Sequence, residues 1–249
     1  MPQNVSVTPS AGRAARLLVP LTGVFVACLV LIPSTASKFI ALGPFALSGA
    51  TLVFPIVFIF NDVLTEVYGY ARARQVIWTG MACQVLASFF YWLVGMWPAA
   101  TFWDNQAAYD SILGTTWRIT IASLSAYFCS EFVNSYIMSR MKYFARGARG
   151  AAQAGRYIAS TLVGQLVDSM IFMGVGFAGV LAKGDLVKTI LTIWLAKTAY
   201  EVVALPLSMP FANWLKRVEG VDALDDPNRT NYNPFQVRQA PAPTEAPTK

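Results

Sequence analysis

The first residues with the potential for chemistry interrupt an apolar run. The segment from Phe54 to Arg74 reads FPIVFIFNDVLTEVYGYARAR, and Asn61, Asp62 and Glu66 follow its apolar residues directly. Asp62 and Glu66 are four residues apart, so they share one face of a helix. A carboxylate at membrane depth is rare and usually faces the protein interior or a wet cavity. The segment is therefore either a helix end whose acids meet the following arginines at the lipid head groups, or one wall of a solute site.

Three later apolar segments also carry polar side chains at helical spacing. In each of them the polar residues recur at intervals of three or four, which places them on one face of a helix. Gln84, in a further apolar run, is better explained as a contact between helices than as a ligand group. The residues on the three faces are Tyr127, Glu131 and Asn134, then Thr161, Gly164, Gln165 and Asp168, and then Lys197 and Glu201.

Some of these side chains could neutralise each other without a ligand. Lys197 and Glu201 are four residues apart, and a same-face pair of opposite charge can form an ion pair. Asp168 has no basic residue within one turn of its own helix, so its partner must come from another helix or from a ligand. Glu131 has the same problem. Because unpaired ions are costly in lipid, several such groups favour one shared polar cavity.

Such a cavity would suit a flat, nitrogen-rich solute. Its carboxylates accept hydrogen bonds from N–H groups and attract cations, whereas a lysine and amides donate to a carbonyl oxygen. Aromatic side chains can stack on a flat ring. A guanine-like base presents an N–H edge beside a carbonyl, which matches an acid next to a donor. A metal cation or an amine would also satisfy the acids, so the residue pattern alone does not choose among these ligands.

The composition is that of an integral membrane protein. The chain has 249 residues, of which 55% are hydrophobic and 13% are charged, compared with about 25% charged residues in soluble domains. The net charge is +6, but the basic residues stand between apolar runs, which is the positive-inside pattern and not a nucleic-acid-binding stripe. The chain has no histidine, which excludes histidine-based zinc sites, serine–histidine triads and histidine proton relays. The three cysteines lie in apolar runs without metal-ligand spacing.

The apolar runs predict an all-α integral membrane protein with six transmembrane helices. Each run is close to the roughly 20 residues that cross a bilayer. The first run follows a polar tail and is expected to remain as a helix, not to be cleaved as a signal peptide. We expect a disordered N-terminal tail over 1–15, a six-helix transmembrane domain over 16–217 and a flexible C-terminal tail over 218–249. The predicted spans are 16–32, 45–68, 75–97, 116–138, 157–181 and 186–215.

The basic residues predict the orientation of these helices. Cytoplasmic loops of membrane proteins carry an excess of lysine and arginine. One side of the predicted bundle holds Lys38, Lys183 and Lys188. The other side is far more basic and includes the 140–156 loop, so both termini are expected in the cytoplasm. Its basic residues are Arg13, Arg16, Arg72, Arg74, Arg140, Lys142, Arg146, Arg149, Arg156, Lys216 and Arg217.

Four motifs follow one another along the predicted membrane region. They are NDVLTEVYGYARAR at 61–74, ASLSAYFCSEFVNSY at 122–136, RYIASTLVGQLVDSMIF at 156–172 and AKTAYEVVALP at 196–206. In this combination and order the chain resembles the VUT (YhhQ-like) family of queuosine precursor transporters. The resemblance implies six membrane helices and import of a 7-deazaguanine base in its cyano or aminomethyl form. Carried over by position, it also implies a substrate site made of Asp62, Glu66, Glu131, Asn134, Asp168, Lys197 and Glu201.

Residues and resemblance together predict an inner-membrane importer of a queuosine precursor for tRNA queuosine modification. The base is expected between the second, fourth, fifth and sixth spans, with Gln165 added to the site because it shares the face of Asp168. Acids would bind the N–H edge of the base, and Lys197 or an amide its carbonyl. No cofactor or metal is expected, and the chain has no G-x-x-x-x-G-K-[ST] motif for ATP. The expected partners are the base, the lipid bilayer and, in a homodimer, a second copy of the chain, but not nucleic acid.

Three other functions fit parts of the pattern. A transporter or substrate-capturing subunit for another small vitamin-like solute would use the same fold, and co-purification with an energising ATPase would identify it. A membrane enzyme could pair Asp62, Glu131 or Asp168 as acid and base, although the chain shows no catalytic sequence pattern of that kind. A purely structural membrane protein would show no uptake defect when its buried acids lose their charge.

Overall fold

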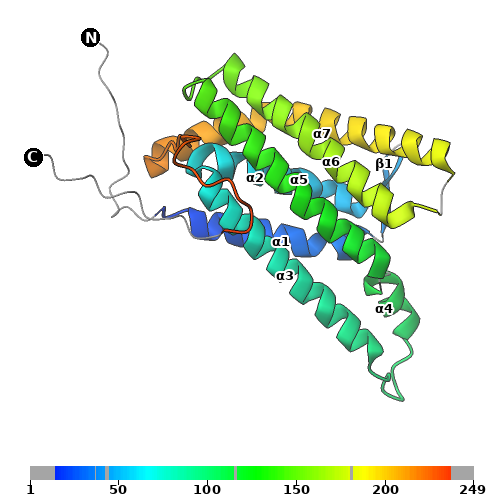
Figure 1. The fold of residues 1–249 in the computed structure, drawn as a ribbon. Coiled ribbons are helices and arrows are strands. Elements are labelled where there is room, and N and C mark those ends of the chain that lie inside the picture. Colours follow the sequence, from blue (N-terminus) through cyan, green and yellow to red (C-terminus); the bar gives the residue numbers. More distant parts are fainter. Residues whose placement is uncertain (1–14, 37, 43–44, 115–116, 180–181, 237–249) are drawn as a thin grey trace, which may run out of the picture.

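The chain folds into a bundle of long helices with one small β-hairpin (Figure 1). The computed structural model describes residues 15–36, 38–42, 45–114, 117–179 and 182–236. The expected all-α fold class is confirmed, and four helices, α1, α3, α6 and α7, are long and apolar enough to cross a membrane. The helices are α1 (Leu18–Ala36), α2 (Phe54–Tyr68), α3 (Tyr70–Met96), α4 (Gln106–Leu113), α5 (Trp117–Phe144), α6 (Ala151–Phe177) and α7 (Lys183–Glu219), with a 3₁₀ turn, η1 (Gly49–Leu52), before α2.

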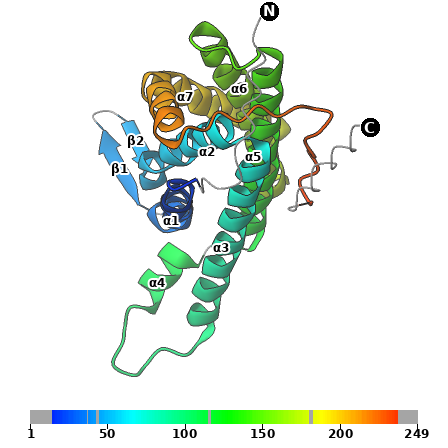
Figure 2. The ribbon, with the colours of Figure 1, turned by 90° about the vertical axis from the view of Figure 1, so that its left-hand side faces the viewer.

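The short helix α2 lies at the centre of the bundle. It packs against α1, α3, α5 and α7, and Figure 2 shows it enclosed between α1, α5 and α7. Every residue from Asn61 to Tyr70 is buried. This buried half of α2 can carry Asp62 and Glu66 because neighbouring helices supply their partners. Its apolar neighbours form the main core, which contains Phe25, Leu29, Val57, Val63, Leu64, Val67, Tyr68, Val76, Ala212 and Leu215.

The prediction of one continuous helix over 45–68 is wrong. The apolar segment before α2 forms two antiparallel strands, β1 (Phe39–Leu42) and β2 (Phe45–Ser48). Only 15 residues remain for α2, and at 1.5 Å per residue they span about 22 Å. That length is shorter than the roughly 30 Å hydrocarbon core of a bilayer. The prediction failed because short apolar runs separated by turn-forming residues suit a hairpin as well as a helix.

The other predicted spans correspond to helices that extend further than expected. Helix α3 begins at Tyr70, α5 continues to Phe144 and α6 begins at Ala151. The predicted 140–156 loop is therefore reduced to residues 145–150. The predicted spans follow the apolar runs and so end at the first charged residues, whereas the helices continue through these residues.

Prolines do not end the helices that contain them. The predicted end of the first span at residue 32 is wrong, since α1 continues through Pro33 to Ala36. Helix α7 passes through Pro206 and Pro210. Proline has no N–H, so Pro206 removes the donor that would otherwise bond to the carbonyl of Val202. Membrane helices tolerate such a carbonyl where protein or a cavity surrounds it.

Helices α5 and α6 pack closely through small residues. A Cβ added at Gly164 would lie 3.0 Å from the Cβ of Asn134 and 3.5 Å from the carbonyl oxygen of Ser130. Small residues at a contact let membrane helices approach each other closely. The contact places Asn134 beside Gly164, whose neighbour Gln165 belongs to the predicted site.

The segment after α7 lies against the bundle as far as residue 236, where the sequence predicts a flexible tail. We name residues 221–236 the C-terminal strap. The amide of Ala223 donates to the carbonyl of Val67 at 3.0 Å, and the amide of Tyr70 donates to Asp225 at 2.8 Å. Gly69, between α2 and α3, has a φ of 81°, and a Cβ there would lie 2.9 Å from an oxygen of Asp225. Glycine at this position therefore serves both the turn and the docking of the strap.

A buried arginine holds the second half of the strap. Arg74 is 0% exposed and donates from Nη1 to the carbonyls of Asn231 and Asn233 at 2.8 and 2.7 Å. The indole of Trp78 donates to the carbonyl of Pro234 at 2.8 Å. A composition rich in proline, asparagine and aspartate predicts flexibility. Here side chains of α3 hold the strap through its backbone carbonyls, and composition cannot predict such contacts.

Candidate functional site

Three polar layers follow one another along α6. From the end of the bundle where the strap docks, α6 carries Arg156, then Thr161 and Gln165, then Asp168. Arg156 and Asp168 are twelve residues apart, which is about 18 Å along a helix. Each layer contacts acids or bases of other helices. We name them the basic-end layer, the middle layer and the far pair.

The basic-end layer is an ion network around Glu66. Arg156 donates from Nε and Nη2 to the Glu66 carboxylate at 2.8 and 2.5 Å, and Lys216 donates to it at 2.6 Å. Lys142 donates to the backbone carbonyl of Glu66 and to Asp222 of the strap, both at 2.5 Å. The side chains of Glu66, Arg156 and Lys216 are at most 1% exposed. A bidentate arginine and a second cation therefore compensate this buried carboxylate.

These contacts decide between two interpretations of the acids in the Phe54–Arg74 segment. The interpretation in which they meet the following arginines is wrong, because Arg74 binds the strap and Glu66 pairs with Arg156 and Lys216. Glu66 lies in the basic-end layer and is not among the residues that line the cavity described below. Its predicted contact with substrate stays a prediction.

The middle layer joins four helices through acids and neutral donors. On one side, Asn134 of α5 donates from Nδ2 to Asp62 of α2 at 2.6 Å. On the other, Glu201 of α7 accepts from Nε2 of Gln165 at 2.5 Å and from the hydroxyl of Thr161. All five side chains are buried. Asp62 and Glu201 thus accept from neutral donors, whereas Glu66 is paired with two cations.

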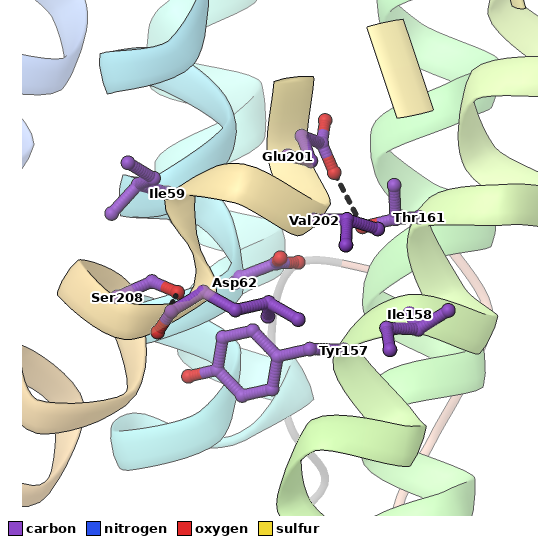
Figure 3. Close-up of a pocket in the computed structure, with 9 residues that line it drawn as sticks. Ile59, Asp62, Tyr157, Ile158, Thr161, Glu201, Val202 and Ser208 are labelled. Carbon is purple, nitrogen blue, oxygen red and sulfur yellow. Dashed lines mark hydrogen bonds between the residues drawn. The ribbon is translucent and has the colours of Figure 1, made fainter. Parts of the chain in front are cut away.

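A small cavity lies between the Asp62 side and the Glu201 side of this layer. Figure 3 shows side chains from α2, α6 and α7 around it, with the hydrogen bond between Thr161 and Glu201. Its volume is about 10 Å³, roughly the room needed by one water molecule. A solute the size of a nucleobase enters only if the surrounding helices move apart. The lining residues are Ile59, Asp62, Tyr157, Ile158, Thr161, Glu201, Val202, Leu205 and Ser208.

The far pair is an ion pair between α6 and α7. Nζ of Lys197 lies 2.5 Å from Oδ2 of Asp168, and the two side chains are 25% and 13% exposed. The same ammonium lies 5.2 Å from the centre of the Phe54 ring, close enough for a cation–π contact. Asp168 thus finds its partner on another helix, which is one of the two options left by the sequence. Lys197 and Glu201 do not form the direct ion pair of the alternative interpretation, because the Lys197 ammonium pairs with Asp168. Glu201 instead accepts hydrogen bonds from Gln165 and Thr161.

Several buried polar atoms near the middle layer have no hydrogen-bond partner among the described residues. The acceptors are Oε2 of Glu131, Oδ1 of Asn134 and Oε1 of Gln165. Buried polar atoms in native proteins are nearly always paired, so this region is prepared for hydrogen bonds from a donor-rich guest. Within the described ranges, no three histidine, cysteine or acidic side chains are placed to hold a metal ion. Other unpartnered atoms are Nδ2 of Asn61, Oγ of Ser169, Oγ1 of Thr198 and the hydroxyl of Tyr157.

Asp222 connects the strap electrostatically to the basic-end layer. Burial alone would raise the pKa of Asp222, but Lys142 and Lys216 outweigh it and hold the pKa below the ordinary 3.8. Lys142 lies 2.5 Å and Lys216 2.9 Å from its carboxylate. The group is therefore ionised at neutral pH, and the strap closes over two buried cations.

The structure brings most of the predicted site residues together. Asp62, Asn134, Gln165 and Glu201 belong to the middle layer, and Glu131 carries one of the unpartnered acceptors. Asp168 and Lys197 form the far pair at the next level of the bundle. Their role in substrate binding stays a prediction.

The sequence did not predict that three basic side chains are buried. It placed Arg156, Lys142 and Lys216 on a cytoplasmic edge, whereas all three point into the bundle and are at most 4% exposed. No local pattern marked them, because the twelve residues between Arg156 and Asp168 place the two side chains about 120° apart around α6.

Comparisons with known proteins identify transporters. Residues 48–210 match the family model described as "Putative vitamin uptake transporter". A similar protein is the "Probable queuosine precursor transporter" of Bacillus subtilis (strain 168), which is 28% identical over 155 residues, or 62% of this chain and 67% of that protein. No solved structure matches the chain. The region matched by the family model contains the middle layer and the far pair.

Proposed function

Because the chain belongs to the putative vitamin uptake transporter family, we propose that it imports a queuosine precursor across the inner membrane. The substrate is a 7-deazaguanine base, 7-cyano-7-deazaguanine or 7-aminomethyl-7-deazaguanine, destined for tRNA queuosine modification. The family and the Bacillus relative are transporters, so the chain is a multi-pass membrane transporter and not an enzyme. The name of that relative supports the choice of substrate.

One structural observation carries this proposal, the set of buried acceptors in the middle layer. Oδ1 of Asn134 and Oε1 of Gln165 lack donors, and the carboxylates of Asp62 and Glu201 lie beside them. A 7-deazaguanine base presents ring N–H groups and an exocyclic amine, which are donors. Bonds from such donors to a carboxylate are charge-assisted and stronger than neutral ones.

The layers above and below this site would act as its closures. The Glu66 network closes the basic end, and the far pair closes the other end of the buried polar region. Substrate enters when Lys197 and Asp168 separate, after which Lys197 donates to the carbonyl of the base and Asp168 accepts from an N–H group. Glu66 then holds the basic end shut while the base is bound. Midplane sites reached alternately from the two sides are typical of secondary transporters.

The proposal includes six crossings with both termini in the cytoplasm. Helices α2 and α5 supply the two crossings beyond the four apolar helices, and α2 crosses together with the hairpin that precedes it. An even number is supported by the contact between the start of α1 and the end of α7, where the amide of Leu17 donates to Glu219 at 2.7 Å. The positive-inside rule places that end in the cytoplasm. A homodimer stays a prediction.

A second candidate substrate is a small vitamin, because the matching family model is described by vitamin uptake. The same acceptors would bind a vitamin with a ring amide or amine. The two candidates differ in competition, since an excess of such a vitamin would block uptake of the base only if they share the site.

The direct test is rescue of tRNA queuosine in cells that cannot synthesise the precursor. Cells carrying this gene, and matched cells without it, receive low concentrations of each base separately. We expect queuosine in tRNA only when the gene is present. Equal queuosine in both strains, with the protein present in the membrane, would refute the proposed substrate.

A further inference from the structure

The middle of the bundle holds more acids than bases. Asp62, Glu131 and Glu201 are at most 9% exposed, and Asp168 lies next to them on α6. The basic side chain at this level is Lys197, which forms an ion pair with Asp168 at 2.5 Å. Three carboxyl groups therefore share a buried region without a cation of their own among the described residues. Three uncompensated negative charges are unfavourable there, because lipid and protein solvate them poorly.

Glu131 is the acid with the least hydrogen-bond support for a negative charge, since the amide of Asn61 is close to its carboxyl group but its Nδ2 makes no hydrogen bond to a described residue. Asp62 accepts a hydrogen bond from an amide, and Glu201 accepts two from Gln165 and Thr161. Glu131 is 2% exposed, and its Oε2 has no hydrogen-bond donor within the described part of the chain. A carboxylate oxygen that is buried without a donor loses the hydration of the ionised form and gains nothing in return.

The charged groups that face Glu131 are all acids. They come from three helices, as Asp62 on α2, Asp168 on α6 and Glu201 on α7. On its own helix the titratable neighbour is Tyr127, one turn away. On α3, which also packs against α5, the Tyr70 ring contacts Phe132 at a tilt of 59°, and its hydroxyl donates to the carbonyl of Tyr232. A proton on Oε2 removes one of the clustered negative charges.

We infer that Glu131 is a proton-binding site and that each substrate molecule enters together with one proton. The inference rests on the proposed function and adds the driving force to it. The proton comes from water on the outer side and binds Oε2 of the Glu131 carboxylate. It leaves from the same oxygen to cytoplasmic water after the base has departed, so the carboxylate is regenerated and no bond of the substrate changes.

Substrate and proton would stabilise each other at this site. A protonated carboxyl group has an O–H that can donate to the carbonyl oxygen of the base. The base in turn donates its N–H groups to the neighbouring acids and so spreads their charge. Coupling of this kind is reciprocal, because a proton that strengthens substrate binding is itself bound more tightly when substrate is present. This mutual preference is what ties the two movements together.

The test measures binding and proton uptake with the purified full-length protein. The probe is 7-cyano-7-deazaguanine, whose nitrile carries no basic amine. At pH values high enough for the substrate-free wild type to lose the Glu131 proton, we expect the Kd to rise with pH, by up to about tenfold per unit, and about one proton to be taken up per base bound in weakly buffered detergent with a pH dye. For Glu131→Gln, whatever its absolute Kd, we expect the pH dependence and the proton uptake to disappear.

A control and a transport assay complete the test. Asp185→Asn removes an exposed acid in the first turn of α7 and should keep the pH dependence of the wild type. In proteoliposomes, an acidic outside should drive accumulation of the base, and a protonophore should abolish it. The transport assay uses the wild type alone, so it remains decisive if Glu131→Gln does not fold.

The possible failures separate the two proposals. Absence of binding and uptake of the base by the wild type would overturn both the proposed function and the coupling. Binding with a constant Kd, together with uptake that ignores the pH gradient, would overturn the coupling and leave the function standing. Retention of the pH dependence by Glu131→Gln would show that the proton binds elsewhere.

Discussion

The far pair is where a structural role and a binding role of single residues can be separated. Lys197 and Asp168 neutralise each other across two helices, and each is partly accessible. An ion pair that only joins helices can be replaced by neutral residues without loss of substrate binding. A pair that opens to receive substrate cannot be replaced in this way. Lys197 contacts Asp168, whereas Glu201 accepts from other donors. The double substitution that tests the ion pair therefore combines Lys197 with Asp168.

We expect Lys197→Met to lower stability by about 3 kcal/mol, because it leaves Asp168 as an uncompensated carboxylate. The double variant Lys197→Met with Asp168→Asn should recover that stability, since neither charge is left unpaired. Binding of the base should not recover. Melting in detergent and isothermal titration measure the two quantities, and Lys188→Met, at an exposed position, is the matched control. Wild-type affinity in the double variant would remove the pair from the site.

Glu66 should behave differently, as a group on which folding depends. Glu66→Gln leaves the buried cations Arg156 and Lys216 without their shared carboxylate. We expect a loss of about 3–5 kcal/mol, the usual effect of breaking a buried ion network from one side. Asp104→Asn, at an exposed position, should change stability by less than about 0.5 kcal/mol. Unchanged melting of Glu66→Gln would contradict the role assigned to the network.

The C-terminal strap is the element whose role the contacts define best. It is fixed by Arg74 at one end and by Asp222 near the other, with Gly69 beneath it. With these contacts the strap covers the ends of α2, α3 and α5 next to the basic-end layer. The strap should therefore remain attached as long as a buried arginine and a charged aspartate are both present.

Arg74→Met should release the strap. The substitution removes the donors to two strap carbonyls and keeps the apolar stem of the side chain, so the loss reports the hydrogen bonds. We expect faster proteolysis within 221–236 and a stability lower by about 2 kcal/mol. Arg72→Met changes the same residue type two positions away at an exposed site and should have no effect. Equal protease resistance in the two variants would show that Arg74 does not hold the strap.

Acid should release the strap only below about pH 4. The pKa of Asp222 is lower in the folded protein than its ordinary value of 3.8. The stabilisation is therefore fully present above that value and is lost as the pH falls through the folded pKa. Hydrogen exchange of the strap should be constant, after correction for intrinsic rates, between pH 5 and 8 and should rise at lower pH. In Asp222→Asn this transition should be absent, and its persistence would point to another group.

At the scale of the whole molecule, the orientation in the membrane is open to a paired labelling test. A cysteine at Ala148, in the loop between α5 and α6, should resist an impermeant thiol reagent added to intact cells. A cysteine at Asp104, before α4, should react. Both positions are exposed, and both variants are made in a background where the natural cysteines are replaced by alanine. The opposite labelling pattern would reverse the orientation.

Local patterns determined the class of the protein and the position of its polar faces. Hydropathy and helical periodicity depend on residues close together in the chain, so they revealed the membrane helices and the faces that carry Asp62, Glu131, Asp168 and Lys197. The same patterns misplaced the hairpin before α2, because a short apolar run suits more than one structure. Resemblance in the four motifs led to the transporter family that the comparisons then identified.

The tertiary structure alone decided which charges meet. Glu66 pairs with Arg156, ninety positions away, and Asp168 pairs with Lys197 on another helix. The strap is fixed by contacts of the same kind, across more than 150 positions between Arg74 and Asn231. Such pairings depend on the rotation and spacing of packed helices, which no local pattern encodes. They separate Glu66, compensated within an ion network, from Glu131, whose charged neighbours among the described residues are acids.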